Sequence, residues 1–244
     1  MNTKTGIAVL AVVIVVAAGA NYTYRNSDEP EVTMQDGAYV IGDKRFIPQE
    51  YNLPADGEIK ILSDYVGTLF AYNGTVIWSE QGTQGFELVG DLKTFRFIPK
   101  TDDTYFVVNN TVYYIGDYKL TALKGVDAQT VEFAGDCAYV EKNRGFYLKD
   151  KFTVFLKEKI VSRDPQNFVA YKVDWYPGAT EVPGGEGYAK DLKKVFYGCG
   201  DELEGADSAS FQYLGNGYAK DARQVEYFGS VLPGTNHTTF TAPK

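Results

Sequence analysis

The chain has 244 residues and a formal net charge of -8, from 32 acidic and 24 basic residues. An acidic surface repels the phosphates of nucleic acids and of anionic lipids, and no long basic run offsets it, so we expect no nucleic-acid partner. One histidine and two cysteines are too few for a closed zinc site, which takes four nitrogen or sulfur ligands. We therefore predict neither a metal nor another cofactor.

An apolar segment near the N-terminus predicts export. Lys4 precedes an uninterrupted run of small and apolar residues, Gly6–Ala20, and small residues at its end suit cleavage after Ala20. The alternative is retention, because Thr5–Tyr24 is long enough to anchor the chain in a membrane. We assign residues 1–20 to a signal peptide or N-terminal anchor. The expected location is the periplasm, the cell surface or the medium.

The composition and the hydrophobic pattern of the sequence change at Gly37. Residues 21–36 are polar and aperiodic, which predicts a linker. After them, short apolar and aromatic runs alternate with turn residues, and the chain contains 19 tyrosines and 15 phenylalanines. This composition and spacing favour many short strands. We predict an all-β domain over residues 37–244, opened by a cap or incomplete unit at Gly37–Pro48.

A repeated unit fills this domain. Its clearest copies are Gly187–Phe211 and Gly217–Phe240, which share Gly-Tyr-Ala-Lys-Asp, a valine four residues after the aspartate, and a closing phenylalanine. Alignment on the closing motif gives about five units, each with an acid or amide four residues before its last apolar residue. These markers are Asp91, Asp127, Asp164, Asp207 and Asn236.

The repeated acids predict backbone roles. Asp191 and Asp221 begin tight connections between two short strands, where an aspartate accepts a hydrogen bond from the N–H two residues on. The acid of the closing motif is a preferred N-cap, and Pro165 after Asp164 suits the first position of a helix. We expect each unit to contain two or three strands and one acid-capped helical turn, with the closing aromatic turned inward.

The pattern Tyr-Ala-Lys-Asp-x-x-x-Val-x-Tyr, followed by Gly-Ala-Asp-x-x-Ser/Thr-Phe, resembles the DKNYY repeat family of bacterial proteins. Residues 187–211 and 217–240 carry the likeness, which extends more loosely back to about residue 60. The resemblance implies an architecture and a bacterial envelope setting, and no activity. Where the family has Lys-Asn after the aspartate, this chain has Leu192-Lys193, Ala222-Arg223 and Lys151-Phe152. Losing an asparagine that tolerates left-handed backbone is expected to alter the hairpin turn.

Tandem units admit two arrangements. We predict antiparallel hairpins in an open meander or solenoid-like array, with a closed propeller-like ring as the alternative. The uneven spacing of the markers favours the open form, because a closed ring needs even blades.

Two cysteines and one histidine leave little chemistry to assign. Cys137 and Cys199 lie in different units, and their spacing does not decide between a disulfide and two separate thiols. His237 lies in the last closing motif, and no nucleophile motif accompanies it. The acidic run from Asp201 to Asp207 is expected to be a solvated turn. We predict no catalytic residue and no enzyme.

The longest insertion between units, Val169–Glu186, is the candidate binding region. It is rich in glycine and proline and contains Trp175 and Tyr176, and long loops on repeat arrays often bind partners. The tyrosines of the repeats are expected to pack between strands instead. The leading hypothesis is a non-catalytic envelope module that binds an unknown protein or glycan. A membrane-anchored spacer and an enzyme of unrecognised type, such as a carbohydrate-active one, are the alternatives.

Overall fold

Small antiparallel sheets follow one another along the chain in the computed structural model. The structure describes residues 30–243, except 65, 66, 82, 84, 117, 141, 142, 172, 173 and 176–183. The predicted signal or anchor, most of the predicted linker and Tyr176 therefore lie outside the described residues. Within the described part, no helix is both long enough and apolar enough to cross a membrane.

The first sheet, here the N-terminal sheet, has three strands, and the five units follow it. Its strands are β1 (Val32–Gln35), β2 (Ala38–Ile41) and β3 (Lys44–Phe46). A 3-10 helix, η1 (Pro48–Tyr51), leads from it to unit 1. Strand β1 lies inside the segment predicted to be linker, so the folded part begins before residue 37.

Units 1 and 2 are four-stranded meanders. Unit 1 contains β4 (Ile59–Ser63), β5 (Gly67–Tyr72), β6 (Thr75–Glu80) and β7 (Glu87–Asp91), followed by the 3-10 helix η2 (Leu92–Thr94). Unit 2 contains β8 (Arg96–Phe97), β9 (Tyr105–Val108), β10 (Thr111–Gly116) and β11 (Lys119–Leu123).

Unit 3 is larger than its neighbours. Its meander is β12 (Glu132–Val140), β13 (Asn143–Lys149), β14 (Val154–Leu156) and β15 (Lys159–Ser162). Two strands from the later insertion, β17 (Asp174–Trp175) and β18 (Gly184–Glu186), extend the same sheet beyond β12.

Units 4 and 5 return to four strands. Unit 4 contains β16 (Val169–Ala170), β19 (Tyr188–Lys190), β20 (Val195–Tyr197) and β21 (Asp201–Glu202). Unit 5 contains β22 (Gln212–Gly215), β23 (Tyr218–Lys220), β24 (Val225–Tyr227) and β25 (Ser230–Val231). The predicted two or three strands per unit are thus too few, because two-residue strands such as β21 and β25 leave no alternation in the sequence.

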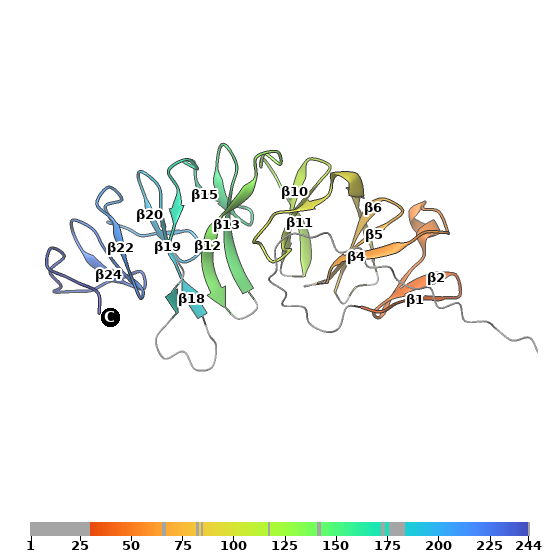
Figure 1. Cartoon of the computed structure of the whole chain (residues 1–244), viewed down its shortest axis with the longest axis horizontal. Coiled ribbons are helices and arrows are strands. Elements are labelled where there is room, and N and C mark those ends of the chain that lie inside the picture. Colours follow the sequence, from red (N-terminus) through yellow and green to blue (C-terminus); the bar gives the residue numbers. More distant parts are fainter. Residues whose placement is uncertain are drawn as a thin grey trace, which may run out of the picture.

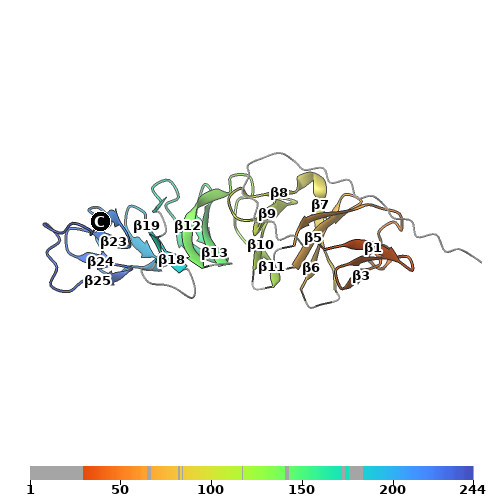
Figure 2. The ribbon, with the colours of Figure 1, turned by 60° about the horizontal axis from the view of Figure 1, so that its bottom comes forward.

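The sheets form an open, gently curved row (Figure 1). The N-terminal sheet and unit 5 stand at opposite ends of the row, and a second view shows the same extended shape (Figure 2). The prediction of an all-β array of tandem antiparallel hairpins is confirmed, and the open arrangement is the one observed rather than the closed ring.

The apolar core is divided among the junctions between consecutive sheets. In β9, Tyr105 and Val107 pack in a cluster with unit 3, whereas Phe106 and Val108 pack in a cluster with unit 1. Successive side chains of a strand point to opposite faces, so an inner strand covered on both faces reads as a continuous apolar run. Each unit therefore depends on its neighbours for burial, as in other repeat proteins.

Candidate functional site

The hairpin aspartates of units 3, 4 and 5 hold their own turns with one carboxylate oxygen. Asp191 Oδ1 accepts hydrogen bonds from the backbone N–H groups of Lys193 and Lys194, at 2.7 and 2.8 Å. Asp150 and Asp221 repeat this pattern in units 3 and 5. Asp191 and Asp221 thus accept backbone hydrogen bonds within their turns, and Asp150 does so as well.

The second oxygen of each hairpin aspartate reaches the preceding unit. Asp127 N donates to Asp150 Oδ2 at 2.8 Å, and Asp207 N donates to Asp221 Oδ2 at 2.6 Å. The donors are the backbone N–H groups of the capping acids in units 2 and 4. All of these hairpin aspartates are buried, and a buried carboxylate is tolerated when several donors satisfy it. We call this arrangement the aspartate latch.

The latch between units 3 and 4 runs through a serine. Ser162 Oγ donates to Asp191 Oδ2 at 2.6 Å and accepts a hydrogen bond from Asp164 N at 3.0 Å. Ser162 is buried, so its hydroxyl connects the hairpin aspartate of unit 4 to the capping acid of unit 3. This is the junction at which a side chain supplies the donor.

The closing motif returns a hydrogen bond to the next hairpin. Thr130 Oγ1 accepts from Lys151 N at 3.1 Å, and Ser210 Oγ accepts from Ala222 N at 2.9 Å. Between units 1 and 2 an asparagine replaces the aspartate: Asn109 Oδ1 accepts from Asp91 N at 3.2 Å. The serine or threonine of the repeat thus has a reason to recur, because its hydroxyl joins consecutive units.

The capping acids also act within their own turns. Asp91, Asp127 and Asn236 each accept a hydrogen bond from the N–H two residues on, at 2.9, 3.1 and 2.9 Å. Asp164 accepts from the side-chain amide of Asn167 at 2.8 Å. The Lys151 ammonium, 2.8 Å away, and the N–H of Gln129 lower the pKa of Asp127.

Ser210 donates to the Asp207 carboxylate and is the main cause of its lowered pKa. Because the pKa values of Asp127 and Asp207 are lowered by folding, their contribution to stability is present above pH 3.8 and is lost as the pH falls further.

A tyrosine hydroxyl makes a second connection at the later junctions. Tyr147 donates to the carbonyl of Gly198 at 2.7 Å, and Tyr188 accepts from Gly229 N at 2.8 Å and donates to the carbonyl of Gly217 at 3.3 Å. In unit 2, Tyr105 accepts from Lys157 N at 3.1 Å. Each of these tyrosines is buried and reaches the next unit. Burial raises the pKa of Tyr147, which keeps its hydroxyl protonated as a donor.

Replacing Tyr188 with phenylalanine is expected to lower the free energy of unfolding by about 1–2 kcal/mol, because the partly buried N–H of Gly229 loses its acceptor and the carbonyl of Gly217 loses a donor. Urea denaturation followed by circular dichroism measures the loss. Tyr118→Phe is the matched control, since Tyr118 is exposed and should change stability little. Equal effects of the two substitutions would contradict the role assigned to Tyr188.

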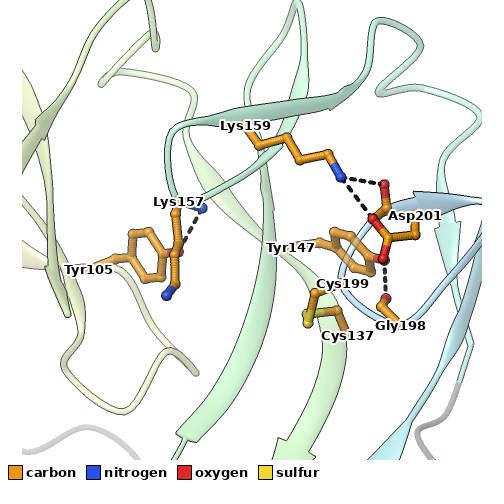
Figure 3. The surroundings of a disulfide bond; sticks show 9 residues. Tyr105, Cys137, Tyr147, Lys157, Lys159, Gly198, Cys199 and Asp201 are labelled. Atoms are coloured by element: carbon orange, nitrogen blue, oxygen red, sulfur yellow. Dashed lines mark hydrogen bonds and ion pairs between the residues drawn. A yellow bond between two sulfur atoms is a disulfide. The ribbon is translucent and has the colours of Figure 1, made fainter. Parts of the chain in front are cut away.

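The two cysteines form a disulfide across the junction between units 3 and 4. Cys137 lies in β12 at a register shift between Asp136 and Ala138, and Cys199 lies in the turn after β20. Figure 3 shows the bond close to Tyr147 and its contact with Gly198. The disulfide and the Tyr147 hydroxyl thus hold the same two units together.

Gly145 makes room for this bond. A Cβ atom at Gly145 would lie 2.4 Å from Cys137 Sγ and 2.7 Å from Cys199 Sγ, closer than real side chains approach. Gly145 pairs with Ala138 in the β12–β13 ladder, directly beside Cys137. A larger residue there would displace the sulfur atoms.

The candidate binding residues lie on the extension of unit 3. Trp175 is in β17, at the edge of the sheet, where it pairs with Gly185 of β18; Tyr176 lies outside the described residues. Strands β12, β13 and β18 project to one side of the row of sheets (Figure 1). We call β12, β13, β17 and β18 the projection. Trp175 lies on a strand that contains neither the aspartates of the latches nor the two cysteines.

The tyrosines of units 4 and 5 pack against other aromatic rings, as predicted. Tyr188 lies 4.9 Å from Tyr197 and 6.2 Å from Tyr213, and Tyr218 lies 4.4 Å from Tyr227, between ring centroids. These contacts join neighbouring strands and consecutive units.

Asp201, Glu202 and Lys44 make structural contacts. In the acidic run, Asp201 pairs with Lys159 at 3.1 Å and Glu202 pairs with Lys194 at 2.6 Å. Near the other end, the buried Lys44 ammonium donates to Ser79 Oγ at 2.8 Å and to the carbonyl of Glu80. Burial lowers the pKa of Lys44. A surface hollow of about 210 Å³ lies beside Lys44. Both acidic and basic residues line it, so its walls carry charges of both signs.

The sequence reasoning missed the residues that join the units. Asp150 follows Tyr147 at the spacing that separates Asp191 from Tyr188, so its signal was present. Ser162 and the tyrosine hydroxyls carry no comparable signal, because their partners lie in other units.

The comparisons agree with this architecture. A family model described as the DKNYY family matches residues 91–244, more than half of the chain. The match starts at the capping acid of unit 1, so it covers every latch described above. No curated protein and no solved structure matches the chain. The chain belongs to the DKNYY family.

Proposed function

We propose that the protein is a non-catalytic, exported module of the bacterial cell envelope that binds a protein or glycan through the projection of unit 3. Its two added strands, β17 and β18, carry this proposal, because none of the latches described above uses them and no other unit has such additional strands among the described residues. Features that a repeat does not need for its own stability are where a chain-specific function belongs.

Two observations support export. The disulfide between Cys137 and Cys199 suits an oxidising compartment, because reducing systems keep most cytosolic thiols free. The apolar run Gly6–Ala20 suits a signal peptide or an anchor. Mass spectrometry of the protein from its native host distinguishes these: a start at Asn21 means cleavage, and a start at Met1 means anchoring.

The binding role is tested by shortening the projection. We would replace residues 172–185 with a two-residue Asn-Gly turn and compare binding to purified peptidoglycan and to detergent-extracted envelope proteins by co-sedimentation and cross-linking. The proposal expects the full chain to bind one of these preparations and the shortened chain to lose that binding while keeping its melting temperature. Binding that survives the deletion places the partner elsewhere.

A structural spacer is the second candidate, and the latches favour it. Hydrogen bonds at each of the junctions from unit 1 to unit 5 would hold the row in one shape, as a spacer requires. Absence of binding by both chains, together with retention of Met1, would favour the spacer over the binding module.

A further inference from the structure

Glu226 in β24 occupies a position that every other unit fills with an apolar or aromatic side chain. The equivalent residues are Ile77, Tyr113, Phe155 and Phe196. Phe155 and Phe196 are buried in the clusters that join their units to the preceding ones. Glu226 is only 1% exposed, so a carboxyl group is buried where the repeat places a ring.

The pairing of β23 and β24 shows which junction contains Glu226. Glu226 stands directly opposite Ala219, and residues directly opposite on antiparallel strands share one face of the sheet. Ala219 packs with Tyr188, Val195 and Phe211 of unit 4. Glu226 therefore faces the junction between units 4 and 5.

The hydrogen bonds of Glu226 are incomplete. Its Oε1 accepts from Gln224 Nε2 at 2.8 Å, whereas its Oε2 has no hydrogen-bond partner among the described residues. By contrast, the buried Asp221 in the same unit has three donors. A buried carboxylate with an unsatisfied oxygen is costly, and its neutral form costs less.

Several other ionisable groups at this junction already have hydrogen-bond partners. In unit 5, Asp221 forms the aspartate latch and Arg223 donates to the carbonyl of Gly205. In unit 4, Lys190 donates to the carbonyl of Ser208, and the Tyr188 hydroxyl bonds to Gly217 and Gly229.

Asp207, also in unit 4, caps its own turn. Burial is the main cause that raises the pKa of Glu226, to about 7; the Asp221 charge raises it further, and the Gln224 hydrogen bond opposes both.

We propose that Glu226 makes the docking of unit 5 onto unit 4 depend on pH, with docking strongest while Glu226 is neutral and weakened once it is ionised. The packing of Ala219 against unit 4 and the latch of Asp221 favour docking at all pH values. The buried charge of Glu226 opposes docking only when its carboxyl group is ionised.

The sign and size follow from the two protonation states. In undocked unit 5 the glutamate has its ordinary pKa of 4.5, and in the docked state its pKa is about 7. Docking is therefore strongest below pH 4.5, weakens as the pH rises from 4.5 to 7, and levels off above 7. The docking equilibrium falls roughly 300-fold between its limits well below pH 4.5 and well above pH 7, and about 70-fold between pH 5 and pH 8.

Hydrogen exchange of the full chain tests the proposal. Protection of the β23 and β24 amides, corrected for the intrinsic pH dependence of exchange, should fall about 70-fold from pH 5 to pH 8, while units 2 and 3 serve as the internal reference. Glu226→Gln, which cannot ionise, should abolish this dependence. Glu226→Phe restores the ring of the repeat and should give protection that is independent of pH.

Two results would overturn the proposal. One is wild-type protection in unit 5 that is the same at pH 5 and pH 8. The other is a pH dependence that persists in Glu226→Gln, which would assign it to another group. Protection of the β23 and β24 amides in each variant at pH 5 shows that unit 5 is folded, and protection in units 2 and 3 shows the same for the rest of the chain.

Discussion

Removal of the disulfide is expected to lower the free energy of unfolding by about 4 kcal/mol, the largest effect we predict. The double substitution Cys137→Ala and Cys199→Ala opens a loop with a sequence separation of 62 residues. Without the bond, the unfolded chain gains the entropy of that loop. The effect should concentrate in units 3 and 4, because the bond crosses their junction and, in a row of sheets, each unit packs only on its neighbours.

Urea denaturation compares the oxidised wild type with the double variant. Addition of a reductant should lower the stability of the wild type to that of the variant and leave the variant unchanged, which is the control. Hydrogen exchange assigns the loss to the units concerned. A loss of less than about 1 kcal/mol would contradict this prediction. It would mean that the unfolded chain is already restricted without the bond, or that the other contacts of the junction hold the units together.

Replacement of Asp191 with alanine is expected to cost about 3 kcal/mol, the second largest effect. The substitution removes a buried carboxylate that accepts from two backbone N–H groups of the turn and from the buried Ser162 hydroxyl. Buried donors without acceptors pay their full desolvation cost. Both the hairpin of unit 4 and its connection to unit 3 are affected.

The measurement is again urea denaturation, with two comparison variants. Asp201→Ala removes an acid whose side chain is 89% exposed, and it should change stability little. Asp191→Asn keeps an acceptor oxygen for the turn and should recover part of the loss. If Asp201→Ala were as damaging as Asp191→Ala, net charge rather than the latch would explain the effect.

The repeat and its turns could be predicted from the sequence because they depend on neighbouring residues. The contacts of Asp191 and Asp221 with the backbone two residues on, and the cap at Asp91, are local. The open array also followed from the uneven unit spacing. The four-strand composition of the units could not be predicted, because strands as short as β21 and β25 have no pattern of their own.

The junction contacts could not be predicted because they depend on how the sheets stack. The second oxygen of Asp191 meets Ser162 only when unit 4 lies on unit 3, and the disulfide joins Cys137 in β12 to Cys199 of the next unit. Glu226 could be recognised in the sequence as an exception to the repeat, but its burial could not. In each case the residue is visible in the sequence, but its role depends on how the sheets stack.

The central claim is that the buried hairpin aspartates join consecutive units, and a double-mutant cycle tests it most directly. Asp191→Ala, Ser162→Ala and the double variant are compared by urea denaturation, since both partners of this aspartate latch are side chains. The latch predicts a coupling free energy of about 1–2 kcal/mol, because the second substitution removes a contact that is already lost. Strictly additive losses would show that Asp191 stabilises only its own hairpin, and would contradict the account.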